Sequence, residues 1–327
     1  MKTRPIGKSG IEASVVGLGT WAIGGWKWGG ADDAESIRAI QASIDAGVSL
    51  IDTAPAYGMG HSETVVGQAM KGRRDKVVLA TKCGLVWHVQ QGAYKFHQQD
   101  KPVHRHLGKA SVMYEVEESL RRLGTDYIDL YITHWQDDDT PIAETMEALE
   151  LLKTQGKIRA IGASNTSTAH IAAYTAAGQL DAIQEGYSMV NREIEGTLLP
   201  VCATNNIATL SYSSLALGLL SGKMSAGRVF AGDDLRKDNP LFSAENRTKV
   251  AGLMAQIAPI CAAHDATEAQ VIIAWTLAQP GITFALCGAR NAAQASENAA
   301  AGALELSADD IYAISAAGAQ HLTGITG

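Results

Sequence analysis

The sequence predicts a (β/α)8 barrel of the TIM type, with extra helices and with long loops at the C-terminal face of its strands. Short runs rich in Val, Ile and Leu alternate with longer segments of helical periodicity, the pattern of strand–helix units on a parallel sheet. Eight such runs fit within the 327 residues, as a barrel requires. An open doubly wound sheet usually has fewer strands and is the alternative. Because no linker rich in Pro, Gly or Ser divides the chain, we expect residues 1–327 to form one domain.

The predicted strands are short and apolar, as expected for strands that are buried on both faces of a parallel sheet. They are assigned from apolar runs that are bounded by turn residues or by helical segments. In chain order they cover residues 15–19, 50–53, 77–81, 127–133, 158–163, 182–184, 208–212 and 283–287.

Helical periodicity, with apolar residues three and four positions apart, is clear between several of these strands and near the C-terminus. Glycine follows three of the segments, as is common at helix C-termini. A Ser307-x-x-Asp310 pattern indicates the N-terminus of the last helix. The predicted helical segments include residues 37–44, 112–123, 142–152, 244–263 and 307–317.

Two long stretches, residues 84–108 and 217–242, show no periodicity of either kind. Each follows a predicted strand, which places both on the C-terminal face of the barrel. Structureless stretches of this length inside a compact domain are usually lids or binding loops. We therefore expect both to border the functional site.

Charge and composition exclude several classes of function. The chain has 27 Lys and Arg against 34 Asp and Glu, a formal net charge of −7, and no run of five like charges. It lacks the basic surface expected of a protein that binds nucleic acid or an anionic membrane. No 18 apolar residues run together and the N-terminus has no apolar leader region, so neither a membrane span nor secretion is predicted.

Cysteines, histidines and one glycine motif do not indicate a metal or a Rossmann site. The cysteines form no C-x-x-C pair, which argues against zinc and disulfides and favours a reducing cytoplasm. The histidine cluster of the first long loop matches no common zinc spacing. The segment 17–22 fits G-x-G-x-x-A, but no helix begins at its third position. The residues concerned are Cys83, Cys202, Cys261 and Cys287, and His88, His97, His104 and His106.

Four ionisable residues fall where predicted strands end or in the loop that follows one. Asp52 ends the second strand, Tyr57 follows it, Lys82 ends the third and His134 ends the fourth. Side chains at these positions share the C-terminal face of a barrel, where active sites lie. The ammonium of Lys82 would lower the pKa of Tyr57 below its ordinary value, and Asp52 would hold Lys82 protonated. Such a tyrosine is a general acid for a carbonyl oxygen, and His134 could orient that oxygen.

These residues lie in motifs that resemble those of the aldo-keto reductase family, in particular its bacterial branch. Residues 52–63, Asp-Thr-Ala-Pro-Ala-Tyr-Gly-Met-Gly-His-Ser-Glu, are similar to the family signature, and Ala-Thr-Lys82 and Tyr-Ile-Thr-His134 follow at the usual intervals. The resemblance extends from Gly17 to Asn298. It implies the same barrel and nicotinamide-dependent reduction of a carbonyl group. It also implies a catalytic tetrad of Asp52, Tyr57, Lys82 and His134, with Tyr57 as the proton donor.

The resemblance further implies where a nicotinamide nucleotide binds. Ser164, Asn165 and Gln184 would bind the carboxamide, and the ring of Tyr212 would stack beneath the nicotinamide. The segment 217–223 is similar to a loop that crosses the pyrophosphate, where glycine allows close approach and lysine supplies charge. Further cofactor-binding residues expected in these regions are Gly19, Thr20, Trp21, Asp52, Ser213, Leu215, Gly222 and Lys223.

The end of the chain that would bind the adenosine departs from the family pattern. Gly288 and Arg290 precede Glu297 and Asn298, but Gln294 stands where the family often has Arg. Arg290 could still contact a ribose 2′-phosphate, because a guanidinium pairs with phosphate in a fork. We therefore expect NADP as the preferred cofactor, with NAD as the alternative.

The predicted substrate site is aromatic. Trp21, Trp87 and Trp135 are expected to line it together with Tyr57 and His134, in a pocket that encloses a small carbonyl compound or sugar. The function expected is reduction of aldehydes and ketones with NADPH. The alternatives are an aldose or alcohol dehydrogenase that runs oxidatively, a binding module that senses nicotinamide nucleotides, and a lyase in which Lys82 forms a Schiff base. The sequence leaves the natural substrate and the oligomeric state open.

Overall fold

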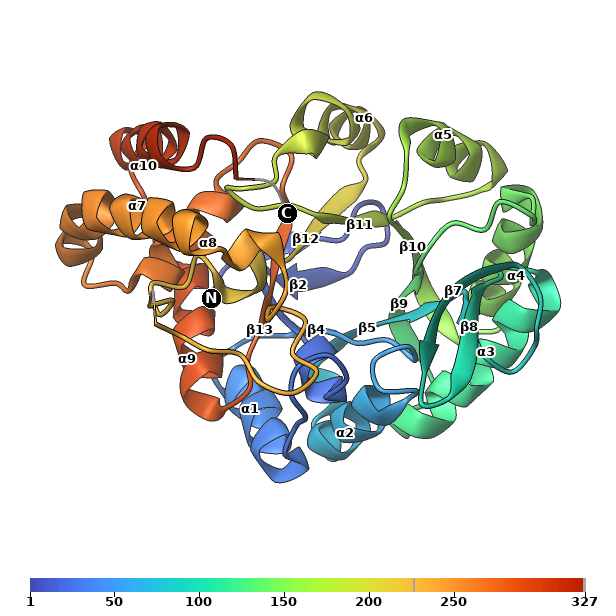
Figure 1. Cartoon of the computed structure of the whole chain (residues 1–327). Helices are drawn as coiled ribbons and strands as arrows, with labels where there is room; N and C mark the ends of the chain where they lie inside the picture. The colour runs from blue at the N-terminus through green and yellow to red at the C-terminus, as the bar shows by residue number, and fades with distance from the viewer. Residues whose placement is uncertain (226, 326–327) are drawn as a thin grey trace.

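The computed structural model describes residues 1–225 and 227–325 and contains a closed barrel of eight parallel strands (Figure 1). The strands neighbour one another in chain order, and β13 pairs with β3 to close the ring. This confirms the predicted fold class and all eight predicted strands, with shifts of a few residues at the ends. The barrel strands are β3 (Val16–Gly19), β4 (Leu50–Asp52), β5 (Val78–Cys83), β9 (Ile128–Thr133), β10 (Ile158–Ser164), β11 (Ala182–Gly186), β12 (Ala208–Tyr212) and β13 (Phe284–Gly288).

Helices surround the barrel (Figure 1). The five predicted helical segments are confirmed, and five further helices in the described part of the chain lacked a clear periodic signal. One of these, α8, is buried over nearly its whole length, so it carries no apolar stripe of the kind that marks a surface helix. The helices are α1 (Asp33–Asp45), α2 (His61–Met70), α3 (Lys109–Leu123), α4 (Ile142–Thr154), α5 (Thr168–Ala177), α6 (Leu198–Asn205), α7 (Ala244–Ala263), α8 (Glu268–Leu277), α9 (Ala292–Ala300) and α10 (Ala308–His321).

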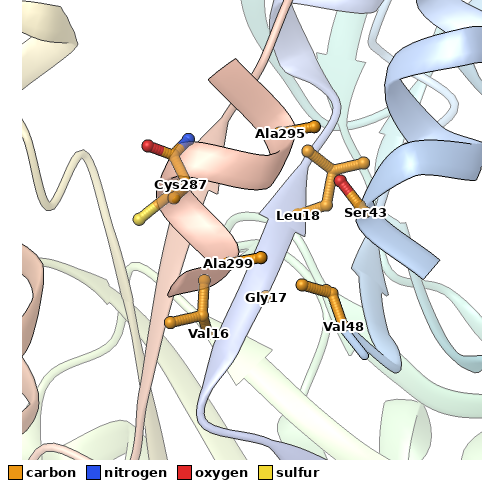
Figure 2. A pocket seen from close by; sticks show the side chains of 9 residues that line it. Val16, Gly17, Leu18, Ser43, Val48, Cys287, Ala295 and Ala299 are labelled. Atoms are coloured by element: carbon orange, nitrogen blue, oxygen red, sulfur yellow. The ribbon is translucent and has the colours of Figure 1, made fainter. Parts of the chain in front are cut away.

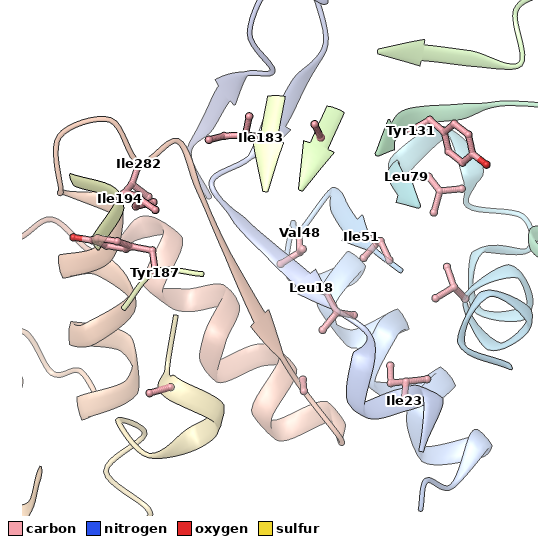
Figure 3. Packing of buried hydrophobic residues seen from close by; sticks show 14 of the residues in the cluster. Leu18, Ile23, Val48, Ile51, Leu79, Tyr131, Ile183, Tyr187, Ile194 and Ile282 are labelled. Carbon is pink, nitrogen blue, oxygen red and sulfur yellow. The ribbon is translucent and has the colours of Figure 1, made fainter. Parts of the chain in front are cut away.

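Apolar side chains form one layer inside the barrel and a second between the strands and the helices. In the outer layer Leu18, Ile51 and Leu79 project from successive strands towards the helices (Figure 3). The inner layer contains Leu50, Leu130 and other side chains from the opposite faces of the strands. Alternate residues of each strand thus serve the two layers, as the two-residue period of a strand requires.

A hairpin that the sequence analysis missed closes the N-terminal end of the barrel. Its strands are β1 (Thr3–Pro5) and β2 (Glu12–Ser14). Ile6 and Ile11, 0% and 5% exposed, pack with the inner layer of the barrel. The strands are too short and too polar to give a strand signal of their own.

Small residues close the seam where β13 meets β3. Figure 2 shows Ala299 of α9 close to Gly17 of β3 and Ala295 close to Leu18, with Ser43 of α1 on the other side. The cavity between them has a volume of about 10 Å³, room for no more than one water molecule. The seam therefore encloses little empty space.

The two long stretches differ in structure. Residues 84–108 were expected to be structureless, and this is wrong, because they form an antiparallel sheet of β6 (Leu85–Val86), β7 (Ala93–Gln98) and β8 (Lys101–Arg105). In the described part of residues 217–242 there are only short 3-10 turns. Both stretches follow the C-terminal ends of barrel strands, as predicted. No helix in the described ranges is long and apolar enough to cross a membrane.

Candidate active site

The barrel brings the four residues of the predicted tetrad to its C-terminal face. Asp52 is the last residue of β4 and Lys82 lies near the end of β5, while His134 directly follows β9. Since β4, β5 and β9 are neighbours, with Asp52 opposite Ala80 and Lys82 opposite Ile132, these ends meet. Tyr57 reaches them from the loop between β4 and α2.

Lys82 is the centre of a buried hydrogen-bond network. Its ammonium, 0% exposed, lies 2.8 Å from both carboxylate oxygens of Asp52 and donates to the carbonyl of Thr53 at 2.9 Å. It also lies 3.2 Å from the Tyr57 hydroxyl. Burial lowers the pKa of Lys82, but the charge of Asp52 and the contacts with Tyr57 outweigh it, so the net pKa is raised. Lys82 is therefore a cation.

Tyr57 is protonated at neutral pH. Burial raises its pKa above the ordinary value, and the opposing charge of Lys82 does not outweigh this. Lys82 does lower the pKa of Tyr57 through its charge and its hydrogen bond, as expected, but burial has the larger effect, because removing a phenolate from water is costly. The expectation of a net pKa below the ordinary value is therefore wrong. Tyr57 consequently holds a proton that it can give to an acceptor.

His134 lies against Tyr57 as a neutral imidazole. The two rings meet edge to face with centroids 5.8 Å apart. Burial, followed by the charges of Lys82 and Lys95, holds the pKa of His134 well below its usual value. A neutral imidazole can donate one hydrogen bond without competing for the proton of Tyr57.

The residues predicted to hold the nicotinamide adjoin the tetrad and are linked to one another. Tyr212 donates its hydroxyl hydrogen to Asn165 Oδ1 at 3.0 Å, and Asn165 Nδ2 donates to the carbonyl of His134 at 2.9 Å. Ser164 donates to the backbone of Gln184 at 2.7 Å, and the Gln184 amide donates to Asp52 Oδ1 at 2.7 Å. Amide and hydroxyl groups therefore surround one edge of the tetrad, the donor and acceptor set that a carboxamide can bind.

The segment after β12 has an unusual backbone. Ser213, Ala216 and Leu217 all have left-handed conformations, with φ of 57°, 48° and 55°. Non-glycine residues adopt such angles at a cost, and they concentrate at functional sites. Leu215 is part of this turn and is half-buried. The turn lies beside Tyr212, where the pyrophosphate loop is expected.

The predicted nucleotide residues further along this edge are linked to one another and to their neighbours. Lys223 pairs with Glu297. Gly222 has a φ of 72°, and a Cβ there would lie 2.8 Å from the Glu268 carboxylate, so that a larger residue would be strained and would displace the Glu268 side chain. Gln294 accepts from the backbone of Arg290 at 2.9 Å, and Asn298 donates to Gly288 at 3.1 Å. Gly288 pairs with Gly19 in the sheet, and the hydroxyl of Thr20, completely buried, donates to the carbonyl of Asp52 at 2.9 Å.

Two loops meet over this edge of the barrel, a contact that sequence reasoning missed. Asp233 accepts from the backbone of Lys27 at 2.9 Å and of Gly29 at 3.0 Å. The guanidinium of Arg290 donates to Gly30 at 3.2 Å. The buried indole N–H of Trp28, in the same loop, has no hydrogen-bond partner among the described residues. A buried donor without a partner, in a loop that Arg290 contacts, is suited to a phosphate-bearing nucleotide.

The aromatic residues predicted to bind substrate lie around the tetrad. Trp21 stacks near Tyr57, with centroids 6.3 Å apart. Trp87 and Trp135 pack against the same small cluster, which contains Ala56 and Phe96. Phe96 comes from the sheet of the first long stretch, whose structure the sequence did not reveal, and it was missed for that reason.

The four histidines of the first long stretch have separate partners. His88 contacts the ring of Tyr114, His97 the hydroxyl of Tyr94, His104 the carbonyl of Gly92 and His106 the carboxylate of Asp137. Among residues 1–225 and 227–325, no three His, Cys, Asp or Glu gather as a metal site.

Comparison with known proteins identifies the family. The sequence model of the aldo/keto reductase family matches residues 15–319 of this chain. Aldo-keto reductase YhdN of Bacillus subtilis is 44% identical over 297 residues, 90% of this chain and 86% of that protein. The NADH-specific methylglyoxal reductase of Escherichia coli is 43% identical over 316 residues, 95% and 96% of the two chains.

Solved structures agree with this result. Glycerol dehydrogenase AKR11B4 from Gluconobacter oxydans superposes with a TM-score of 0.87 at 37% identity, over 99% of this chain and 96% of that chain. An aldo-keto reductase from Klebsiella pneumoniae in complex with NADPH gives 0.73 at 30% identity, over 100% and 98%.

The barrel and the polar centre at its C-terminal face define an oxidoreductase that acts on carbonyl or alcohol groups with a nicotinamide cofactor. The chain belongs to the aldo/keto reductase family.

Proposed function

We propose that this enzyme reduces aldehydes and ketones with NADPH, and that Tyr57 gives the proton. The observation that carries the proposal is the ammonium of Lys82 between the Asp52 carboxylate, at 2.8 Å, and the Tyr57 hydroxyl, at 3.2 Å. When bound, the nicotinamide nucleotide would supply the hydride for the carbonyl carbon. The residues of the chain donate the proton and orient the reacting groups.

As negative charge develops on the carbonyl oxygen, Tyr57 transfers its hydroxyl proton to that oxygen. The phenolate left on Tyr57 is stabilised by Lys82, which stays charged because Asp52 faces it. The neutral ring of His134 donates a hydrogen bond to the carbonyl and fixes its direction. Ser164, with Asn165, Gln184 and Tyr212 beside it, would hold the nicotinamide.

NADPH is proposed over NADH because Arg290 is an exposed guanidinium at the edge where the adenosine ribose would lie. The Klebsiella relative is described with NADPH, whereas the Escherichia coli relative is named NADH-specific. The nucleotide would lie along Gly19, Thr20 and Trp21 at one end of the groove. Further contacts would come from the segments that hold Ser213, Leu215, Gly222, Lys223, Gly288, Gln294, Glu297 and Asn298.

Oxidation of an alcohol or polyol is the second candidate, since the Gluconobacter relative is named a glycerol dehydrogenase and the same proton transfer runs in both directions. A Schiff-base lyase is not supported, because it requires a neutral Lys82 and the pKa of Lys82 is raised. We also propose that the chain is one domain and acts in a reducing cytoplasm, which suits its four buried free cysteines.

The test is the variant Tyr57→Phe. It removes the proton donor but keeps the ring, so we expect kcat for small aldehydes to fall roughly 10²- to 10⁴-fold while the Kd for NADPH changes little. Nucleotide affinity is measured by fluorescence titration, and turnover by loss of NADPH absorbance over a panel of aldehydes, ketones and aldoses.

The outcomes distinguish between the proposed function and its alternatives. Parental rates in Tyr57→Phe would show that another group gives the proton. Tight nucleotide binding by the parent without turnover of any carbonyl or alcohol would favour the sensor. Tyr131→Phe is a matched control, because it alters a buried tyrosine of β9 that lies on the outer face of the barrel wall.

A further inference from the structure

The strand β7 carries a bulge beside the active site. Its pairing with β8 shifts between Tyr94 and Phe96, so Lys95 is the extra residue. In a regular strand Lys95 and Phe96 would point to opposite faces. Here Tyr94 is 56% exposed, whereas Phe96 packs on the cluster next to Tyr57 and Lys95 lies over Trp135. The bulge therefore turns two consecutive side chains towards the substrate site, as bulges near active sites often do.

The end of this strand is tied to the catalytic loop. With its amide oriented to satisfy both groups, Gln98 donates to the carbonyl of Ala56 at 3.1 Å and accepts from the backbone of Gly58 at 3.3 Å. These two residues flank Tyr57. The position of β7 relative to the proton donor is thus determined by hydrogen bonds.

Lys95 places a positive charge beside the tetrad. Its ammonium lies 3.4 Å from the centroid of the Trp135 ring, and Trp135 is the residue after His134. Its charge contributes to the low pKa of His134. Burial and the neighbouring Arg105 lower the pKa of Lys95 itself, which is typical of two cations that share a site.

Lys95 and Arg105 together have only one acidic partner among the described residues, Asp138. No Asp or Glu of the described residues forms an ion pair with Lys95. Arg105 pairs with Asp138 through one terminal nitrogen at 3.1 Å, and its other terminal nitrogen donates to the carbonyl of Gln136 at 3.3 Å. The Nε of Arg105 is buried and has no hydrogen-bond partner within the described ranges. An ammonium that has no acidic partner, beside a guanidinium with one unmet donor, is an arrangement that can bind a carboxylate.

From this arrangement we propose that Lys95, with Arg105 behind it, binds a carboxylate on the substrate, and that the enzyme prefers carbonyl compounds that carry one. The inference rests on the proposed function and names its substrate class. Trp87, Trp135 and Phe96 would enclose the carbon chain between the carboxylate and the carbonyl group.

The test compares 4-oxobutanoate with its methyl ester, which carries a neutral methyl ester group in place of the carboxylate. We expect kcat/KM of the parent to be about tenfold higher for the anion, mainly through KM, since a charge-assisted hydrogen bond distinguishes them. Lys95→Met should bring the ratio close to one, and Lys95→Arg should retain most of the preference. Lys101→Met, on the exposed side of the same hairpin, is the control and should leave the ratio unchanged.

A ratio near one in the parent, or an unchanged ratio in Lys95→Met, would overturn the inference, while reduction of the ester would leave the proposed function intact. If neither compound is reduced, the proposed function fails for carbonyl compounds of this class. The role of Lys95 is then tested by carboxylate binding alone. Butanoate is then titrated into the nucleotide complex and followed by tryptophan fluorescence. Weaker binding in Lys95→Met would support the carboxylate site, and equal binding would contradict it.

Discussion

At the scale of single residues, the protonation states at the site follow from burial and from one ion pair. Lys82 has four acceptor atoms within 3.2 Å and keeps its proton. Tyr57 keeps its proton because burial outweighs the charge of Lys82. The state of Lys82 agrees with the expectation from the sequence, whereas that of Tyr57 could not be derived from residue types, because it depends on how deeply the phenol is buried.

Arg290 provides a prediction about cofactor choice. Arg290→Ala removes the guanidinium proposed for the 2′-phosphate, so we expect the Kd for NADPH to rise by roughly tenfold with little change for NADH. Both are measured by fluorescence titration, with the remote exposed Arg38→Ala as the control. Equal losses for the two nucleotides would assign Arg290 a structural role through its contact with Gly30.

At the scale of elements, α3 is joined to the end of β5 by a buried carboxyl group. Glu115, 6% exposed, accepts from the backbone of Gly84 at 3.0 Å and from Ser111 at 3.3 Å. Burial raises its pKa from the ordinary 4.5 to about 8. The folded state therefore binds a proton that the unfolded state releases between these two values.

It follows that Glu115 lowers stability as pH rises from 4.5 to 8, because folding then requires uptake of a proton. Glu115→Gln keeps an acceptor oxygen and cannot titrate. We expect its free energy of unfolding, relative to the parent, to increase over this range by a few kcal/mol and to level off at higher pH. Urea unfolding at several pH values measures this, and a constant difference would contradict it.

The two loops that meet over the proposed nucleotide groove form a second element-scale feature. Asp233→Ala removes two hydrogen bonds to the 27–29 backbone, each worth about 1 kcal/mol. We expect NADPH to dissociate several-fold faster while kcat for a slow substrate changes little. Stopped-flow displacement gives the rate. Asp238→Ala, an exposed position in the same segment, is the control, and equal rates in both variants would mean that the loops do not retain the nucleotide.

At the scale of the whole molecule, the hairpin that closes the barrel and the catalytic tetrad lie at opposite ends of the barrel. The N-terminal hairpin closes one end through Ile6 and Ile11, and Arg4 fastens it by donating to Ile282 at 2.8 Å and Leu277 at 3.2 Å. The tetrad occupies the other end. A defect in the hairpin should therefore affect unfolding and leave the site intact.

Ile6→Ala tests this separation. The side chain is 0% exposed, so its truncation should cost about 2–5 kcal/mol of unfolding free energy, and Ile6→Val about 0.5–1.5. At low temperature KM and kcat should stay near the parental values. Loss of nucleotide binding in a variant that remains fully folded would show that the two ends of the barrel are coupled.

The sequence by itself determined the strand–helix alternation and the positions of Asp52, Tyr57, Lys82 and His134, because apolar periodicity and strand ends depend on local order along the chain. It did not reveal the N-terminal hairpin or the sheet of residues 85–105, whose strands are short and owe their stability to packing on distant parts of the barrel. The tertiary structure alone decided the raised pKa of Tyr57 and the contact of Lys95 with Trp135. Both depend on burial and on approach between segments far apart in sequence, and residue order does not encode these locally.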